Sequence, residues 1–238
     1  VDFKLICLPK NMIINTNKNF NLSNINITNI FCTSYVKSLA YLNKLNLKKT
    51  SFLEIGFERS TIIFYQNNKL KFIKAIPVGS FHITKDISKI FKISIEDAEK
   101  VKNVFSQTET EFSYNNNSTN NISIKEIIDR NISIDLLKKV ILYRIQEIID
   151  LTFKKSEYEI GNTKDSELFL IGGGSNIFNN NSFYLNDNFQ FKSIKYYEET
   201  DIEICSSALK YHLNNIQSRE KLNKKTGLFE KFFNFFGK

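Results

Sequence analysis

Three consecutive glycines follow a short apolar segment in the last third of the chain. Residues 167–171 read ELFLI, and directly after them come Gly172, Gly173, Gly174 and Ser175. Because glycine has no Cβ, a ligand can approach the backbone closely at the carboxyl end of a strand, where open α/β sheets bind nucleotides. A tight structural turn explains the triplet equally well, so the glycines alone leave both interpretations open.

An acidic and a basic side chain stand three residues apart in the segment DAEKVKN. They are Glu99 and Lys102, and this spacing places both on the same side of a helix. Taken alone, they are best interpreted as an exposed ion pair.

The last twelve residues, 227–238, separate apolar from polar side chains completely when placed on a helix. At about 100° per residue, the apolar side chains fill an arc of roughly 160°. These are Leu228, Phe229, Phe232, Phe233, Phe235 and Phe236, and the opposite arc includes Lys231 and Lys238. The helix could pack on its own domain, but a charged segment, SREKLNKKTG, precedes it. We therefore predict binding to an anionic membrane surface.

The composition is that of a folded protein with an excess of positive charge. Of 238 residues, 42% are hydrophobic and 24% are charged, and the formal net charge is +8. These values exclude wholesale disorder and favour an anionic partner. The three scattered cysteines and two histidines predict neither a disulfide framework nor a metal site. Since no apolar stretch approaches the roughly 20 residues of a membrane-spanning helix, we expect a cytoplasmic or peripheral protein.

Strands and helices that would position these residues can be predicted from periodicity and capping. Residues 51–78 predict a three-stranded meander with a turn at Asn67-Asn68, because asparagine tolerates the left-handed conformation. Helices are predicted at 83–91, after the capping Ser94, at 134–153 after Ser133, and at 204–216, whereas 114–121 reads as a loop. Strands that alternate with helices indicate the α/β class.

One face of the predicted helix 134–153 should belong to the core. Its apolar residues recur at spacings of three and four. They are Leu137, Val140, Ile141, Ile145 and Ile148, with Thr152 completing the face.

The order of the segments resembles that of the FtsA family of bacterial actin-like cell-division proteins. The segments are LEIGFERSTIIFYQNNKLKFIKAIPVGSFHITKDI, IEDAEKVK, ILYRIQEII and LFLIGGGSNIF, followed by the charged segment and the amphipathic end. The resemblance implies an actin-like (ribonuclease H-like) ATPase fold of the α/β class, mainly its second half, with an inserted small subdomain. We therefore expect the chain to be the C-terminal part of a longer protein.

The resemblance also implies a domain organisation. The expected parts are the end of the first actin-like half at 1–50, the core of the second half at 51–87 and 166–217, an inserted FtsZ-binding subdomain at 88–165, a linker at 218–226 and a membrane-targeting helix at 227–238.

The roles of individual residues follow from the same resemblance. Glu99 and Lys102 match the pair that binds ribose, and Gly172 to Gly174 match the adenosine-binding turn, with Ser175 and Gly56 expected nearby. The implied cofactor is ATP, with magnesium. Arg144 and Arg130 stand where family arginines contact the acidic C-terminal tail of FtsZ, and guanidinium groups pair well with carboxylates.

The implied function is that of a cell-division protein. It would tether FtsZ filaments to the cytoplasmic face of the inner membrane at the division site and self-associate into actin-like filaments. No nucleic-acid partner is expected. Two alternatives are a PilM-like pilus-assembly protein and an active ATPase of the actin, chaperone and sugar-kinase superfamily.

The chain departs from the family at the phosphate-binding hairpin. The family pattern is Asp-x-Gly-Gly-Gly-Thr-Thr, whereas residues 54–60 read EIGFERS. Phe57 adds bulk and Glu58 adds negative charge where glycine amides would otherwise cradle phosphate. We therefore predict no robust hydrolysis, and no catalytic or metal-ligating residue is assigned.

Overall fold

The computed structural model divides into two compact units. The residues it describes are 6–42, 44–45, 47–107, 133–153, 163–178, 191–197 and 199–223. The first unit contains Tyr41–Glu199, and the second combines Leu5–Ala40 with the segment from Thr200 onward.

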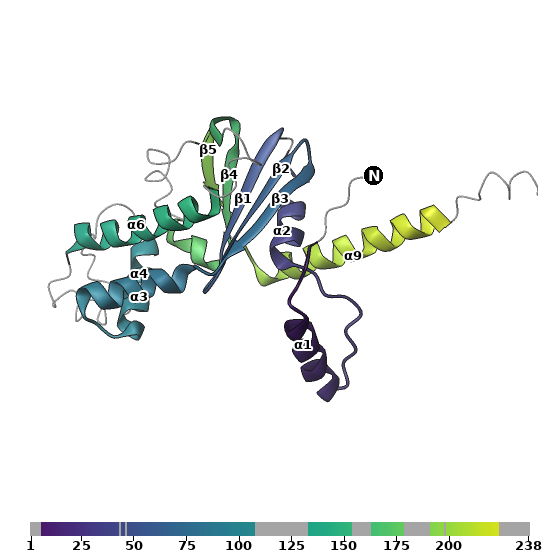
Figure 1. Ribbon diagram of the computed structural model, residues 1–238, viewed down its shortest axis with the longest axis horizontal. Coiled ribbons are helices and arrows are strands. Elements are labelled where there is room, and N and C mark those ends of the chain that lie inside the picture. Colours follow the sequence, from purple (N-terminus) through teal and green to yellow (C-terminus); the bar gives the residue numbers. More distant parts are fainter. Residues whose placement is uncertain are drawn as a thin grey trace, which may run out of the picture. The chain divides into compact units, whose positions relative to one another are not determined.

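A five-stranded mixed sheet forms the centre of the first unit (Figure 1). Its strands are β1 (Lys49–Ile55), β2 (Ser60–Gln66), β3 (Lys69–Ile76), β4 (Glu167–Ile171) and β5 (Ser193–Tyr196). Their order across the sheet is β3-β2-β1-β4-β5. The first three strands pair antiparallel, and β4 lies parallel to both β1 and β5. The predicted meander and the buried ELFLI strand are confirmed.

The turn between β2 and β3 has the predicted conformation. Asn67 and Asn68 have φ angles of 51° and 58°, in the left-handed region that asparagine tolerates. Two consecutive left-handed residues match the twist of the flanking antiparallel strands.

Three helices of the first unit gather on one side of the sheet, as Figure 1 shows. They are α3 (Ser80–Phe91), α4 (Ile95–Gln107) and α6 (Ile134–Phe153). The predicted caps are present, because the Ser94 hydroxyl accepts from Asp97 N at 3.0 Å and the Ser133 hydroxyl accepts from Leu136 N at 3.3 Å. Two short 3₁₀ helices, η3 (Thr163–Asp165) and η4 (Gly173–Phe178), flank β4.

The main core lies between these helices and the sheet. Alternate residues of β1, such as Leu53 and Ile55, face Ile83 and Ile87 of α3 in one buried cluster, as the two-residue period of a strand requires. The predicted face of α6 is confirmed as core: Leu137, Val140, Ile141, Ile145, Ile148 and Thr152 are all buried. This packing fixes α3 and α4 where they meet the carboxyl ends of β1 and β4.

Aromatic side chains cover the opposite face of the sheet. Phe52 stacks on Phe169 with ring centroids 5.4 Å apart and meets Tyr65 edge-on at 6.0 Å. Tyr41 lies 4.9 Å from Tyr197. Such pairs contribute about 0.5–1.5 kcal/mol beyond the free energy of burying their surface. The sheet is therefore stabilised by packing on both of its faces.

The second unit contains α1 (Lys10–Leu22), most of α2 (Thr33–Leu42) and α9 (Asp201–Asn223). Tyr211 of α9 meets Phe31 and Tyr35 edge-on at 5.3 and 5.8 Å. Helix α9 includes the predicted 204–216 but continues to Asn223, so the first six residues of the expected linker are helical. Among the described helices, none is long and apolar enough to cross a membrane.

Candidate functional site

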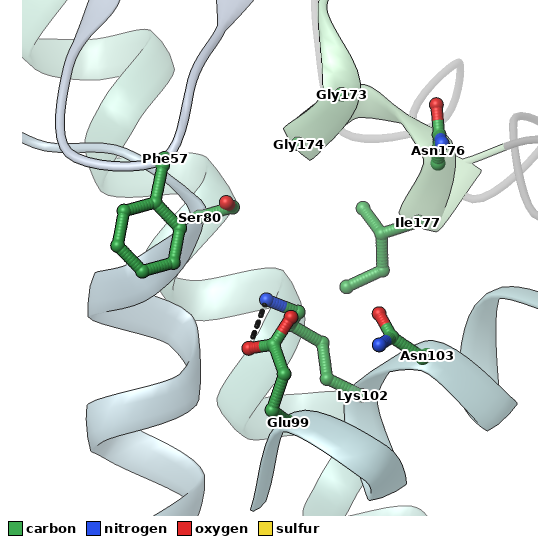
Figure 2. A pocket seen from close by; sticks show the side chains of 9 residues that line it. All are labelled: Phe57, Ser80, Glu99, Lys102, Asn103, Gly173, Gly174, Asn176 and Ile177. Atoms are coloured by element: carbon green, nitrogen blue, oxygen red, sulfur yellow. Dashed lines mark hydrogen bonds and ion pairs between the residues drawn. The ribbon is translucent and has the colours of Figure 1, made fainter. Parts of the chain in front are cut away.

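A pocket of about 260 Å³ opens at the carboxyl ends of β1 and β4 (Figure 2). Helix α4 contributes Glu99, Lys102 and Asn103, and η4 contributes Gly173, Gly174, Asn176 and Ile177. Ser80, the first residue of α3, and Phe57, in the turn between β1 and β2, complete the described lining. The fold thus brings four of the nominated residues, Glu99, Lys102, Gly173 and Gly174, around one space.

Glu99 and Lys102 form a tight three-way contact with Thr84 of α3. Lys102 Nζ donates to Glu99 Oε2 at 2.7 Å and to Thr84 Oγ1 at 2.9 Å, while Thr84 Oγ1 donates to the same Glu99 oxygen at 2.5 Å. The Lys102 side chain is only 8% exposed. The pair is therefore not a simple surface ion pair, because a buried ammonium needs partners of this kind.

The environment of Glu99 favours its ionised form. Partial burial alone would raise the pKa of this carboxyl, but hydrogen bonds from Lys102 and Thr84 and the nearby ammonium charge hold the pKa below its ordinary value. Glu99 is therefore a carboxylate at neutral pH. It can accept hydrogen bonds from the hydroxyl groups of a ligand.

The glycines serve two different purposes. A Cβ at Gly173 would meet nothing within 4 Å, whereas one at Gly174 would lie 2.8 Å from Ile55 O. Gly172 has a φ of 90° and donates its N–H to Glu199 Oε2 at 2.9 Å. The buried Ser175 hydroxyl donates to Ile171 O at 2.5 Å. Gly172 and Ser175 thus shape the turn, and Gly173 and Gly174 face the pocket.

The turn after β1 packs closely onto the start of α3. Ser80 N donates to Gly56 O at 2.9 Å, and Phe81 N donates to Phe57 O at 2.8 Å. Gly79 has no room for a Cβ, which would lie 2.5 Å from Gly56 O. Gly56 itself does not belong to the described lining of the pocket. Its role here is to join the turn to the helix.

Phe57 closes one end of the pocket. Its ring stacks on Phe81 with centroids 4.6 Å apart and an interplanar angle of 23°, and Lys85 Nζ lies 4.5 Å from the Phe81 ring centroid. The lining therefore fits the nucleoside part of ATP, with an open backbone at Gly173 and a carboxylate at Glu99. The turn does not fit the phosphate part, because the bulky Phe57 ring lies there. Among the described residues, no cluster of His, Cys, Asp and Glu could hold a metal ion.

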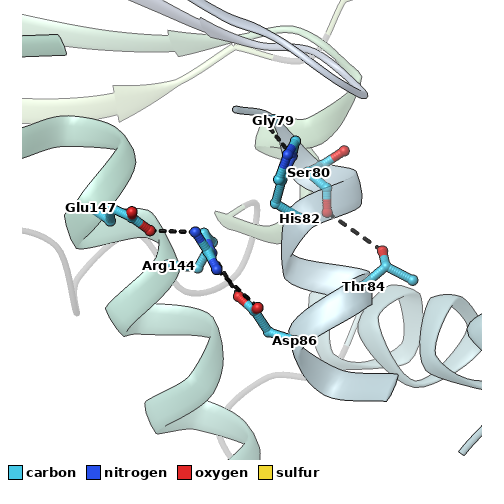
Figure 3. A network of polar contacts seen from close by, with 7 residues as sticks. All are labelled: Gly79, Ser80, His82, Thr84, Asp86, Arg144 and Glu147. Atoms are coloured by element: carbon cyan, nitrogen blue, oxygen red, sulfur yellow. Dashed lines mark hydrogen bonds and ion pairs between the residues drawn. The ribbon is translucent and has the colours of Figure 1, made fainter. Parts of the chain in front are cut away.

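Arg144 lies on α6 and binds carboxylates of its own chain (Figure 3). Its Nε and Nη2 donate to the Asp86 carboxylate of α3 at 2.6 and 2.9 Å, and Nη1 donates to Glu147. The hydrogen bonds to Asp86 raise the pKa of Arg144 above its already high value. Its predicted contact with a partner remains a prediction. Arg130 and residues 228–238, which are predicted to bind the membrane, lie outside the described residues.

Sequence reasoning missed several residues of the pocket. Asn103 follows Glu99 by four residues and so shares its helical face, a signal that could have identified it. Asn176 accepts a hydrogen bond from the Tyr196 hydroxyl at 2.6 Å. Ser80 and Thr84 reach the site only because α3 crosses beside α4, which residue spacing does not reveal.

The family comparison agrees with the expectation from the sequence. The model described as "Cell division protein FtsA" matches residues 52–226, more than half of the chain. Cell division protein FtsA of Helicobacter pylori strain 26695 is 32% identical over 99 residues, 41% of this chain and 20% of that protein. The protein of the same name from Bacillus subtilis strain 168 is 35% identical over 104 residues, 43% of this chain and 23% of that protein. The matched part thus spans about a fifth of the length of these curated relatives.

Solved structures show the same fold at low sequence identity. MreB 5 of Spiroplasma citri bound to AMPPNP superposes with a TM-score of 0.60 at 17% identity, covering 90% of this chain and 68% of that one. The PilM–PilN type IV pilus biogenesis complex gives 0.53 at 13% identity, covering 78% and 47%. These similarities confirm the predicted actin-like α/β fold. The family match over residues 52–226 shows that this chain belongs to the FtsA family of cell division proteins.

Proposed function

We propose that this chain forms the second actin-like half of an adaptor that tethers FtsZ filaments to the cytoplasmic face of the inner membrane at the division site. The observation that carries this proposal is the family match over residues 52–226, which includes the expected FtsZ-binding insertion. The similarity to the PilM complex shows the fold alone, so nothing specific favours a role in pilus assembly.

Membrane attachment is assigned to residues 227–238. Full burial of one large apolar side chain is worth about 1.5–3 kcal/mol, so six partly buried ones would contribute on the order of 5–10 kcal/mol. The cost of ordering the segment takes back several kcal/mol of this gain. A single copy should therefore bind reversibly, and many copies on a self-assembled filament should bind firmly.

Recognition of FtsZ is assigned to the acidic tail of that protein and to basic residues of the inserted subdomain. Arg144 is the candidate within the described residues. Its guanidinium already donates hydrogen bonds to the carboxylates of Asp86 and Glu147. An acidic peptide would bind by sharing or displacing these two groups.

Nucleotide is assigned a structural role, not a catalytic one. The support is the pocket beside Glu99 and Gly173, and a nucleotide analogue is bound in the structural neighbour MreB 5. When bound, a nucleotide supplies hydroxyl groups and a flat base that Glu99 and the open backbone at Gly173 would orient. The residues of the β1–β2 turn argue against rapid hydrolysis.

The adaptor proposal is tested by vesicle flotation with a fluorescent FtsZ-tail peptide. With the intact chain, the peptide should float with vesicles that contain anionic lipid. Omission of residues 227–238 should leave the peptide in the bulk, and Arg144→Glu should release the peptide while the chain itself still floats. A peptide that stays in the bulk although the intact chain floats would contradict the proposal.

A further inference from the structure

We propose that the pocket recognises the nucleoside and is indifferent to the phosphates that the nucleoside carries. This inference rests on the proposed nucleotide ligand. It goes beyond that proposal in naming the chemical class to which the site responds, an uncharged sugar and base. The charge balance of the lining, the hydrogen bonds at the start of α3 and the position of the Phe57 ring carry it.

The two charged side chains of the described lining neutralise each other. Among its described lining residues, the charged side chains are Glu99 and Lys102, which pair with each other at 2.7 Å. A phosphate group would need uncommitted cations or amide donors to replace its hydration. The Lys102 ammonium already donates hydrogen bonds to Glu99 and Thr84. An uncharged ligand therefore suits this lining better than a phosphate does.

The nearest helix N-terminus is not available for phosphate either. The first amides of a helix ordinarily attract anions because they lack partners within the helix. At the start of α3, Gly79 N donates to His82 Nδ1 at 3.2 Å, and His82 N donates to Gly79 O at 3.0 Å. Ser80 N and Phe81 N donate to carbonyl groups of the β1–β2 turn. All four donors therefore have protein acceptors.

The turn that faces this helix adds bulk. Phe57 is 58% exposed and stacks on Phe81, and the exposed Glu58 follows it directly. A phosphate chain at this end of the pocket would meet the Phe57 ring.

Calorimetric titration of the chain with adenosine, ADP and magnesium-ATP tests the inference. The three dissociation constants should agree within about threefold, which corresponds to no net contribution from the phosphates. Magnesium-ATP binding that is tighter than adenosine binding by about tenfold or more would overturn the inference. That result would leave the proposed adaptor function intact. Failure of all three ligands to bind would overturn both the inference and the assignment of a nucleotide ligand.

A variant of the turn tests the cause of this indifference. The double substitution Phe57→Gly and Glu58→Gly should strengthen magnesium-ATP binding by about tenfold, because it removes the ring and the carboxylate. The ratio of the adenosine to the magnesium-ATP dissociation constant, measured on the same preparation, separates the effect on the phosphates from any change in the pocket itself, and an unchanged melting temperature verifies that the variant is folded. Glu96→Gln removes an exposed carboxylate from α4 and serves as the matched charge control. A double variant that still does not distinguish ATP from adenosine would overturn the role assigned to Phe57 and Glu58.

Discussion

Arg144 and Asp86 join α6 to α3 through a bidentate ion pair. Arg144 Nε and Nη2 lie 2.6 and 2.9 Å from the two oxygens of the Asp86 carboxylate. Both side chains are about a quarter exposed, at 23% and 26%. The residue expected to bind an acidic partner thus also holds two helices of its own fold together.

This double role predicts that one substitution, Asp86→Asn, has opposite effects on peptide binding and on stability. Asp86→Asn should strengthen binding of the FtsZ-tail peptide by about threefold, because it removes a competing charge from Arg144. The same change should lower the free energy of unfolding by about 1 kcal/mol, as for other partly exposed pairs. Fluorescence anisotropy and urea denaturation measure the two effects. Unchanged peptide affinity in Asp86→Asn would separate Arg144 from the peptide site.

The contact between Glu99 and Lys102 predicts a specific response to acid. The pKa of Glu99 is lower in the folded chain than its ordinary value. The Glu99 carboxylate therefore stabilises the fold fully when the pH is above the ordinary pKa of glutamate. This stabilisation is lost as the pH falls through the lowered pKa. From pH 7 to pH 3, the wild type should therefore lose more stability against urea than Glu99→Gln does. Parallel losses in the two proteins would contradict the assigned hydrogen bonds.

Alanine substitutions at two glycines should separate an effect on stability from an effect on ligand binding. Gly79→Ala should destabilise the chain by about 2–3 kcal/mol, because its Cβ would press on three backbone atoms within 2.5–2.7 Å. Gly173→Ala should leave the melting temperature nearly unchanged, because its Cβ would meet nothing within 4 Å. Its methyl group would instead enter the pocket and weaken adenosine binding. Undiminished adenosine affinity in a stable Gly173→Ala protein would show that ligands bind elsewhere.

The terminal phenylalanines are expected to dominate lipid binding. The combined substitution Phe232→Glu and Phe236→Glu should reduce co-sedimentation with anionic vesicles by at least about tenfold, because two apolar anchors become charged. Leu22→Glu is the matched control, since Leu22 is 78% exposed on α1. Equal co-sedimentation of the double variant and the control would show that another surface binds the lipid.

Much of the first unit could be predicted from local patterns. The meander, the Asn67-Asn68 turn and the caps at Ser94 and Ser133 depend on neighbours in sequence, and all are present. The buried face of α6 follows from spacing alone. Interactions between sequence neighbours were therefore sufficient to predict the helix that carries Glu99 and the strand that precedes the glycines.

Other features depend on contacts between distant segments. Strand β5 is only four residues long and includes Lys195, so its sequence carries little strand signal, and its pairing with β4 defines it. Helix α1 contains no buried residue and exposes Met12, Ile14, Phe20 and Leu22, so it has no core face of the kind that identified α6. The ion pair of Arg144 with Asp86 joins residues 58 positions apart, and no spacing rule indicates such a contact.

The central claim is that this protein links FtsZ filaments to a membrane, and imaging of a supported anionic bilayer tests it most directly. Fluorescent FtsZ filaments should accumulate on the bilayer in the presence of the intact chain. They should remain in solution when the chain carries Phe232→Glu and Phe236→Glu or Arg144→Glu. Equal accumulation with all three proteins, or none with the intact chain, would contradict the account.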